Sequence, residues 1–174
     1  MKALEEYVRC IPDYPKEGIM FRDVTTVLTD ADGLKLAIDE MQKKLEGVDF
    51  DVVAGLEARG FIFGAPIAYN LHKPFVPIRK KGKLPAETVS IKYELEYGSA
   101  EIEIHKDSIK PGQKVVIVDD LVATGGTVAA AIKLFEMLGG EVVMNLFLIE
   151  LKGLEGRKAI GDYPVETVIQ YEGA

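Results

Sequence analysis

Two adjacent carboxylates stand at the end of an apolar run, and a turn of small residues follows them. The run is Val115–Val118, the carboxylates are Asp119 and Asp120, and the turn contains Ala123, Thr124, Gly125, Gly126 and Thr127. Small residues let the backbone wrap closely around a ligand with its N–H groups pointing inward. The helix predicted after the turn adds unpaired N–H groups and a partial positive charge. These features indicate a phosphate-binding turn.

The two aspartates restrict what can bind beside this turn. The turn lacks the lysine of the glycine-rich loop that many nucleotide-binding proteins use. Asp119 and Asp120 would repel a second phosphate but suit neutral hydroxyl groups, or a Mg²⁺ ion that already carries phosphate. The simpler alternative, an N-capping aspartate before a glycine-rich turn, explains one aspartate and one glycine but not the whole sequence. We therefore expect a sugar phosphate as the ligand.

Cations gather in one short segment of an otherwise acidic chain. The net charge is −7, yet four cations fall within five positions: Arg79, Lys80, Lys81 and Lys83. A local basic cluster on an acidic protein favours a small anionic ligand over nucleic acid, although a solvated loop would have the same composition. A second candidate is Arg59, in a turn between a predicted strand and helix, where a guanidinium can bind phosphate with two hydrogen bonds. A capping turn with an exposed arginine is the alternative there.

The elements that must position these residues alternate between strand and helix. Strands are predicted at 51–55, 75–78, 114–118, 142–149 and 164–170, the last at an edge of the sheet. Helices are predicted from Leu34 to Leu45, with Asp30 or Asp32 as N-cap, at 60–71, with Pro66 in its first turn or at a kink, and at 127–138. Residues 89–95 and 100–104 alternate around Tyr97-Gly98, which predicts a β-hairpin. This order predicts a parallel sheet with helices on both faces and right-handed crossovers, and ligands bind beyond the carboxyl ends of such strands.

Length and composition are typical of a single domain spanning residues 1–174. The one cysteine, Cys10, cannot form an internal disulfide, and we interpret it as a half-buried packing residue rather than a nucleophile. The N-terminal residues lack the apolar stretch of a signal peptide, and no run is long enough to span a membrane. We therefore expect a cytoplasmic protein that binds neither membranes nor nucleic acid.

The thirteen residues from Val115 to Thr127 resemble the phosphoribosyl pyrophosphate signature of the type I phosphoribosyltransferases without a break. The resemblance implies an α/β fold with a mostly parallel central sheet flanked by helices, a β-hairpin lid at about 87–105 and an N-terminal base-binding hood at about 1–30. It implies that residues 123–127 hold the 5′-phosphate and that Asp119 and Asp120 face the ribose hydroxyls. It also implies Mg²⁺ bound mainly through the substrate, with Asp119 or Asp120 as an alternative protein ligand, and a homodimer.

Further segments resemble the members of this family that act on adenine. In the segment 15–24, Phe21 would pack near the base while the backbones of Met20 and Arg22 read its edge, and Leu151 would pack on the base. Adenine and hypoxanthine present opposite donors and acceptors at this edge, so backbone groups can discriminate between them. Without the resemblance, Phe21 would be a core aromatic residue and Arg22–Asp23 a surface ion pair.

The resemblance also assigns the leaving group and the lid. Pyrophosphate would be bound by these residues: Glu57, Ala58, Arg59, Gly60, Arg79 and Lys83. Glu96 matches the candidate catalytic acid or base in a lid that also contains Tyr97, and a closed lid would exclude water from the activated sugar. Arg59, Asp119 and Asp120 complete the expected catalytic set.

The implied reaction is purine salvage: transfer of the 5-phosphoribosyl group from phosphoribosyl pyrophosphate to adenine, giving AMP and pyrophosphate. Alternatives are an enzyme for xanthine, hypoxanthine or guanine, a regulator that senses phosphoribosyl pyrophosphate without catalysis, or a sugar-phosphate binding module. The negative charge and the absence of a spare segment for DNA binding argue against the regulator.

Overall fold

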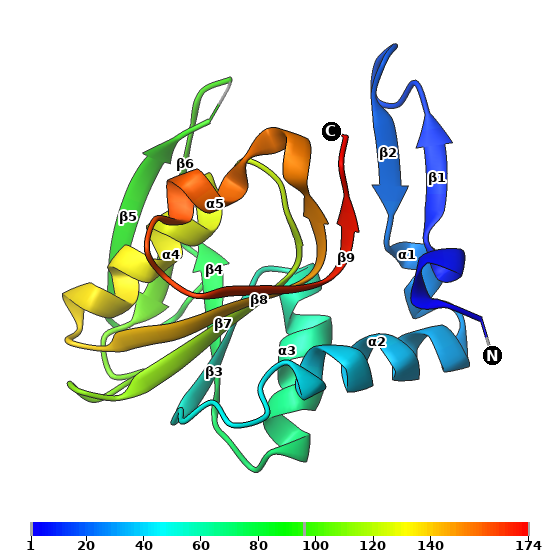
Figure 1. The fold of residues 1–174 in the computed structure, drawn as a ribbon. Helices are drawn as coiled ribbons and strands as arrows, with labels where there is room; N and C mark the ends of the chain where they lie inside the picture. Colours follow the sequence, from blue (N-terminus) through cyan, green and yellow to red (C-terminus); the bar gives the residue numbers. More distant parts are fainter. Residues whose placement is uncertain (1, 96, 174) are drawn as a thin grey trace.

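A seven-stranded sheet forms the centre of the computed structural model, which describes residues 2–95 and 97–173. Its order is β5-β6-β4-β3-β7-β8-β9 (Figure 1). The bounds are Val52–Leu56 for β3, Phe75–Lys80 for β4, Thr88–Glu94 for β5, Ser99–His105 for β6, Lys114–Val122 for β7, Glu141–Leu151 for β8 and Val165–Tyr171 for β9. The neighbours from β4 through β9 pair in parallel, whereas β6 is antiparallel to both β4 and β5. The mostly parallel sheet predicted from the sequence is confirmed, with β9 at its edge.

The central strand β7 explains why the carboxylates lie where they do. Val115, Val116, Ile117 and Val118 are fully buried, as expected for a parallel strand covered on both faces. The strand continues four residues beyond the predicted end at Val118, because its ladder with β8 continues to the pair of Val122 and Glu150. The two aspartates therefore belong to the strand and are held by its hydrogen bonds.

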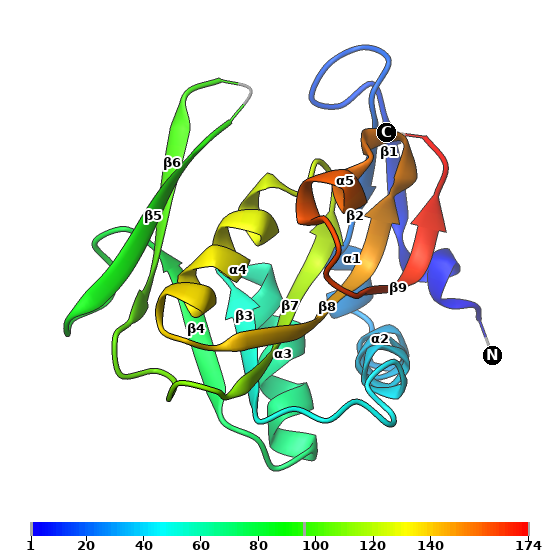
Figure 2. The same cartoon turned by 60° about the vertical axis from the view of Figure 1, so that its left-hand side comes forward.

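Helices cover both faces of the sheet (Figures 1 and 2). One core cluster packs α2 (Ala31–Lys43) and α3 (Arg59–Asn70) against the sheet, and the other packs α4 (Gly126–Met137) and α5 (Gly156–Ile160) against its opposite face. The second 3₁₀ helix, η2 (Lys152–Leu154), joins β8 to α5. The three predicted helices are thus confirmed, whereas η2 and α5 are additional.

Two local predictions about helices have different outcomes. Asp30 is the N-cap of α2, since its side chain accepts hydrogen bonds from the backbone N–H groups of Asp32 and Gly33. The sequence predicts Pro66 either in the first turn of its helix or at a kink. The structure places it inside α3, beyond the first turn. A proline there removes one N–H group from the helical hydrogen-bond ladder.

The N-terminal segment forms a small sheet of its own. It begins with the 3₁₀ helix η1 (Leu4–Tyr7), continues through the antiparallel strands β1 (Arg9–Pro12) and β2 (Met20–Asp23), and ends in the short helix α1 (Thr25–Leu28). The sequence did not predict these elements. In Figure 2 the β1–β2 sheet lies next to β8 and β9.

The contacts within this small sheet differ from one prediction, for Cys10, and from the alternative ion pair of Arg22 with Asp23. Asp23 pairs with Arg9, not with Arg22. Arg22 lies over the ring of Tyr171, 3.9 Å from its centroid. Cys10 is exposed rather than half-buried, as is most of β1, and Arg22 Nη1 donates to its sulfur at 2.6 Å.

The predicted hairpin is confirmed as β5 and β6, which project from the sheet beyond β4 (Figure 2). Ile102 and Ile104 are buried on its inner face, while Lys92 and Glu94 are exposed. None of the helices in the described residues has the length and apolar character needed to cross a membrane.

Candidate active site

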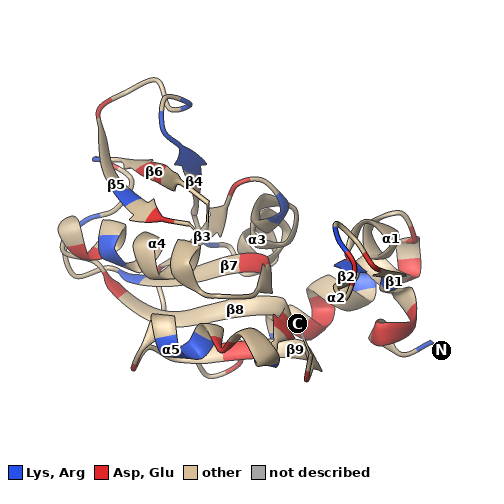
Figure 3. Cartoon of the chain, turned by 90° about the horizontal axis from the view of Figure 1, so that it is seen from above, with Lys and Arg blue, Asp and Glu red and all other residues tan. Residues whose placement is uncertain are grey.

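The carboxyl ends of β3, β4 and β7 open into a cavity of about 540 Å³. A smaller one of about 130 Å³ adjoins it, and the two share Leu56, Asp119 and Thr127. Seen from above, β4 has a blue segment and β7 a red one, with β3 between the two strands (Figure 3). The site therefore lies at the edge of the sheet where the sequence predicts ligand binding.

The smaller cavity is lined by the turn 123–127, for which the sequence predicts phosphate binding. Its lining includes Ala123, Thr124, Gly125, Gly126 and Thr127, which the sequence predicts to act together. Gly125 has φ 81° and caps α4, and a Cβ atom built there would lie 2.3 Å from the backbone oxygen of Gly156. Glycine is required here because a side chain disfavours this positive φ and because a Cβ atom would clash with the backbone of α5.

The two aspartates have different partners, although their carboxyl groups lie close enough to interact. Asp119 lines both cavities, and its Oδ1 accepts the backbone N–H of Asp120 at 2.8 Å. Asp120 is only 4% exposed and pairs with Arg59 of α3. Burial, and then the neighbouring charge of Asp120, raise the pKa of Asp119 well above 3.8.

The two expected pyrophosphate segments meet through Glu57. The bond between Glu57 and Ala58 is a cis peptide, and α3 begins at Arg59. Glu57 Oε1 accepts hydrogen bonds from Arg79 Nε at 3.0 Å and from the backbone N–H of Lys80 at 3.2 Å. Gly60 packs closely on β7, because a Cβ atom there would lie 2.7 Å from the oxygen of Val118.

Lys83 lies in an exposed turn that follows β4. Its backbone N–H donates to the oxygen of Lys80 at 3.3 Å, and Gly82 has φ 91°. Arg79 and Lys80 line the larger cavity together with Glu57. The structure thus brings Glu57 and Arg79 together, while Lys83 does not line the cavity.

The expected base-binding residues come from opposite ends of the chain. Met20 and Phe21 are partly exposed on β2, so Phe21 is not a core residue. Arg22 stacks on Tyr171, and Tyr171 is the register partner of Leu151 at the end of β8. Residues 20–22 therefore lie beside the end of β8 that carries Leu151.

Tyr97, one of the two expected lid residues, lies at the tip of the β5–β6 hairpin. Glu96 lies outside the described residues, and Tyr97 is 83% exposed. The backbone N–H of Leu95 donates to the oxygen of Gly98 at 2.9 Å, which closes the turn.

Sequence reasoning missed two site residues. Tyr93 of β5 lines the larger cavity, and its hydroxyl donates to Thr127 Oγ1 at 3.2 Å. Its place in the alternating apolar pattern of the hairpin led to its interpretation as packing, although a tyrosine hydroxyl usually needs a partner. Gly156 contacts the phosphate-binding turn, and nothing in the sequence around it indicates that contact.

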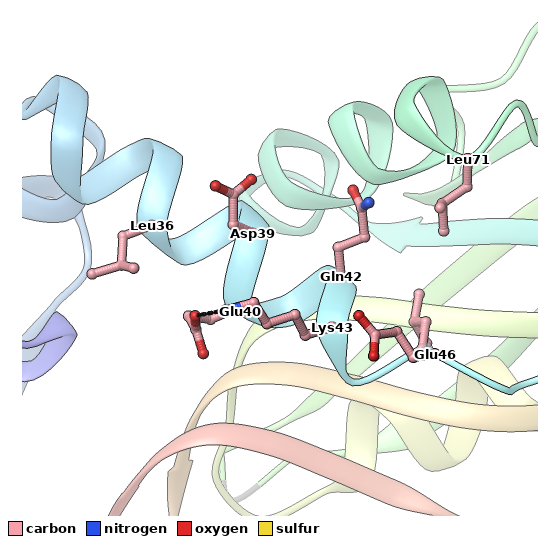
Figure 4. Close-up of a pocket in the computed structure, with 8 residues that line it drawn as sticks. Leu36, Asp39, Glu40, Gln42, Lys43, Glu46 and Leu71 are labelled. Atoms are coloured by element: carbon pink, nitrogen blue, oxygen red, sulfur yellow. Dashed lines mark hydrogen bonds and ion pairs between the residues drawn. The ribbon is translucent and has the colours of Figure 1, made fainter.

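Another hollow, of about 360 Å³, lies along α2 near Leu71 (Figure 4). Two of its charged side chains, Lys43 and Glu40, pair with each other at 2.6 Å. It contains none of the expected site residues.

Within the described residues, no group of three or more His, Cys, Asp or Glu side chains could hold a metal ion. The carboxylate of Asp119 lines the cavity, whereas that of Asp120 is engaged by Arg59. This donor set fits Mg²⁺, which binds through one or two carboxylates together with substrate phosphates and water.

Comparison with known proteins gives consistent matches over the chain. Residues 25–172 match the model of the phosphoribosyl transferase domain family. The adenine phosphoribosyltransferase of Agathobacter rectalis is 68% identical over 173 residues, which cover 99% of each chain. The crystal structure of the Thermoanaerobacter pseudethanolicus adenine phosphoribosyltransferase has a TM-score of 0.92 at 55% identity and covers 97% of this chain and 100% of that one. The Saccharomyces cerevisiae enzyme, complexed with an imino-altritol bisphosphate and adenine, has a TM-score of 0.88 at 40% identity, covering 95% and 96%.

Proposed function

This chain belongs to the phosphoribosyltransferase family, and we propose how its residues transfer a 5-phosphoribosyl group from phosphoribosyl pyrophosphate to adenine. The products are AMP and pyrophosphate, so the protein is a purine-salvage transferase. The type I fold expected from the sequence is confirmed. One observation carries the assignment of roles: Asp119 lines the same small cavity as the turn 123–127.

The turn 123–127 binds the 5′-phosphate in our proposal. Its backbone is held at the N-terminus of the twelve-residue helix α4, whose free N–H groups favour an anion. Thr124 and Thr127 add hydroxyl donors. Asp119, in the adjoining wall, accepts a hydrogen bond from a ribose hydroxyl.

Asp120 has a different part in this proposal from the one expected of it. It is buried and holds Arg59 through the Nε atom, which leaves the two terminal nitrogens of the guanidinium free for a phosphate group. Asp120 therefore orients the arginine that binds pyrophosphate, and Asp119 is the carboxylate that contacts the sugar. The backbone of 57–60 and the side chains of Arg79 and Lys83 complete the pyrophosphate site.

Catalysis by this site consists mainly of positioning and charge stabilisation. Displacement of pyrophosphate at C1 by a ring nitrogen of adenine builds positive charge on the ribose and negative charge on the leaving group. Arg59 and the basic segment stabilise the leaving pyrophosphate, while the carboxylate of Asp119 stabilises the sugar. Asp119 would hold a Mg²⁺ ion together with the substrate phosphates, and the ion would supply further positive charge to them.

The base binds, in our proposal, between β2 and the end of β8. Phe21 packs near adenine, the backbones of Met20 and Arg22 read its edge, and Leu151 packs on its face. The stacking of Arg22 on Tyr171 supports this arrangement, because it fixes β2 beside the register partner of Leu151. Residues 1–30 act as a hood and 87–105 as a lid that carries Glu96 and Tyr97, all within one domain of residues 1–174. We assign the protein to the cytoplasm as a homodimer.

An assay of two variants tests these roles. Arg59→Ala and Asp120→Asn each lower kcat/KM for AMP formation at least about 100-fold, the range seen when one electrostatic stabiliser is removed. Steady-state kinetics with phosphoribosyl pyrophosphate, Mg²⁺ and adenine measure this loss, and Lys158→Met of α5 serves as the charge-matched control. Near-normal turnover in both variants would overturn the assignment. Assays with hypoxanthine, guanine and xanthine test the base site, and a product from one of them would contradict the roles of residues 20–22.

A further inference from the structure

Glu103 of β6 is a buried carboxylate that faces the basic turn after β4. It is 2% exposed, and its Oε1 accepts the backbone N–H groups of Gly82 at 3.2 Å and of Leu84 at 3.0 Å. Its Oε2 accepts the hydroxyl of Thr88 at 3.2 Å. These two N–H groups stand on either side of Lys83 in the chain. One carboxylate therefore holds the turn at both neighbours of that lysine.

The charge of Glu103 is retained despite its burial. Burial by itself would raise its pKa, but the hydrogen bonds from Leu84, Thr88 and Gly82 outweigh burial and lower it. The nearest cation is Lys81, whose Nζ lies 3.8 Å from Oε2. An ionised carboxylate accepts stronger hydrogen bonds than a neutral group, so these bonds hold the turn firmly.

Beyond the hydrogen bonds that Glu103 accepts, those made by Lys83 itself are long, although the N–H of Lys81 donates to the oxygen of Glu101 at 3.0 Å. The N–H of Lys83 donates to the oxygen of Lys80 at 3.3 Å, and Arg79 Nη1 donates to the oxygen of Lys83 at 3.5 Å. Glu57 fixes only the start of the turn, at Lys80. The orientation of Lys83 thus depends on Glu103 more than on any other side chain among the described residues.

We propose that Glu103 is a positioning residue that orients Lys83 toward the pyrophosphate of the substrate and ties this turn to the β5–β6 hairpin. Glu103 does not line the cavity, so it acts through the turn and not on the substrate. The inference rests on the role proposed above for Lys83. It adds a link between the pyrophosphate site and the hairpin, because Glu103 and Thr88 belong to its two strands.

The first test is Glu103→Gln, which keeps the shape of the side chain but removes its charge and one acceptor. We expect KM for phosphoribosyl pyrophosphate to rise about tenfold, which corresponds to about one hydrogen bond to a charged group. KM for adenine and kcat change less than about twofold in the same assay. The control is Glu87→Gln, which removes the same charge from an 85% exposed side chain near the same hairpin and leaves both KM values unchanged.

A double-mutant cycle with Lys83→Met separates this inference from the proposed function. If Glu103 acts through Lys83, Glu103→Gln raises KM for phosphoribosyl pyrophosphate in the wild type but adds little to Lys83→Met. An equal rise in both backgrounds overturns the inference, as does no rise in the wild type. An unchanged KM in Lys83→Met alone would instead overturn the proposed role of Lys83.

Circular dichroism shows whether the Glu103→Gln variant folds. If it does not, Thr88→Val takes its place in the double-mutant cycle. The valine has the shape of threonine but cannot donate to Glu103. A rise of about twofold to threefold in KM for phosphoribosyl pyrophosphate, absent in the Lys83→Met background, supports the inference. An unchanged KM overturns it.

Discussion

Asp119 and Asp23 look alike in the sequence, but their folded surroundings shift their pKa values in opposite directions. Burial and the charge of Asp120 raise the pKa of Asp119. The hydrogen bond from Thr25, and then the one from Arg9, lower the pKa of Asp23 from 3.8 to about 2. Each aspartate is followed by a polar or charged residue within two positions, so only the folded contacts distinguish them.

The lowered pKa of Asp23 has a consequence for stability in acid. A carboxyl group whose pKa is lower in the folded protein stabilises the fold above about pH 4, and this contribution is lost as the pH falls toward about 2. We expect the free energy of unfolding of the wild type to fall more steeply over this range than that of Asp23→Asn. Urea denaturation at a series of pH values measures the slopes. Thr25→Val, which removes the first of these hydrogen bonds, has an intermediate slope, and equal slopes in all three proteins would contradict the assignment.

At the scale of elements, α5 supports the phosphate-binding turn through backbone contact. A Cβ atom at Gly156 would lie 2.5 Å from the oxygen of Ala123. Arg157, the next residue, donates two hydrogen bonds to Glu150 at 2.7 and 2.8 Å. Thr167 of β9 donates to the same carboxylate at 3.0 Å. The position of α5 is therefore fixed to the end of β8, next to Leu151.

Gly156→Ala tests this support. The methyl group forces α5 and the turn apart, since a backbone oxygen cannot rotate away as a side chain can. We expect a loss of about 1–3 kcal/mol in stability, the usual range for overpacking, and a rise of several-fold in KM for phosphoribosyl pyrophosphate. Thermal unfolding and steady-state kinetics measure the two effects. Gly173→Ala, where a Cβ atom meets nothing within 4 Å, is the matched control. Wild-type kinetics in Gly156→Ala would show that α5 does not support the turn.

The elements that sequence reasoning predicted correctly are those with a continuous local signal. The apolar β-branched run of β7 and the Asp30 cap of α2 are examples, because both depend on neighbours in the chain. The ion pair of Arg59 with Asp120 joins residues 61 positions apart, and no local pattern indicates it. The strands β1 and β2 have exposed residues and no alternation, and α5 is only five residues long, so both escaped prediction.

At the scale of the whole molecule, α3 presents an apolar stripe on its outer side. Ile62, Ala65 and Tyr69 are exposed at helical spacing, and Tyr69 is 86% exposed. The opposite side of the helix packs Phe63 and Ile67 into the core. Exposed apolar residues in a row on one element favour association, and a second copy of the chain is the partner we propose.

Sedimentation equilibrium tests this association. We expect the wild-type protein to have twice the mass of the 19.1 kDa chain and the double variant Ile62→Lys, Tyr69→Lys to have the mass of one chain. Two charges on each copy would have to be buried against their equivalents, which opposes dimer formation. Met137→Lys changes an exposed apolar residue of α4 and leaves the dimer intact. A dimeric double variant would exclude α3 from the interface.

Among the described residues, the strands β1 and β2 pair only with each other, and neither joins the seven-stranded sheet. Residues 20–22, assigned to base recognition, thus lie outside the sheet assigned to sugar and phosphate chemistry, whereas Leu151 of the base site belongs to β8. A cassette of residues 8–24, exchanged for its counterpart from a relative with another base preference, would leave every hydrogen-bonded strand pair of the seven-stranded sheet in place. Nucleobase preference can therefore diverge during evolution, or be redesigned, while the machinery for handling the activated sugar is inherited unchanged.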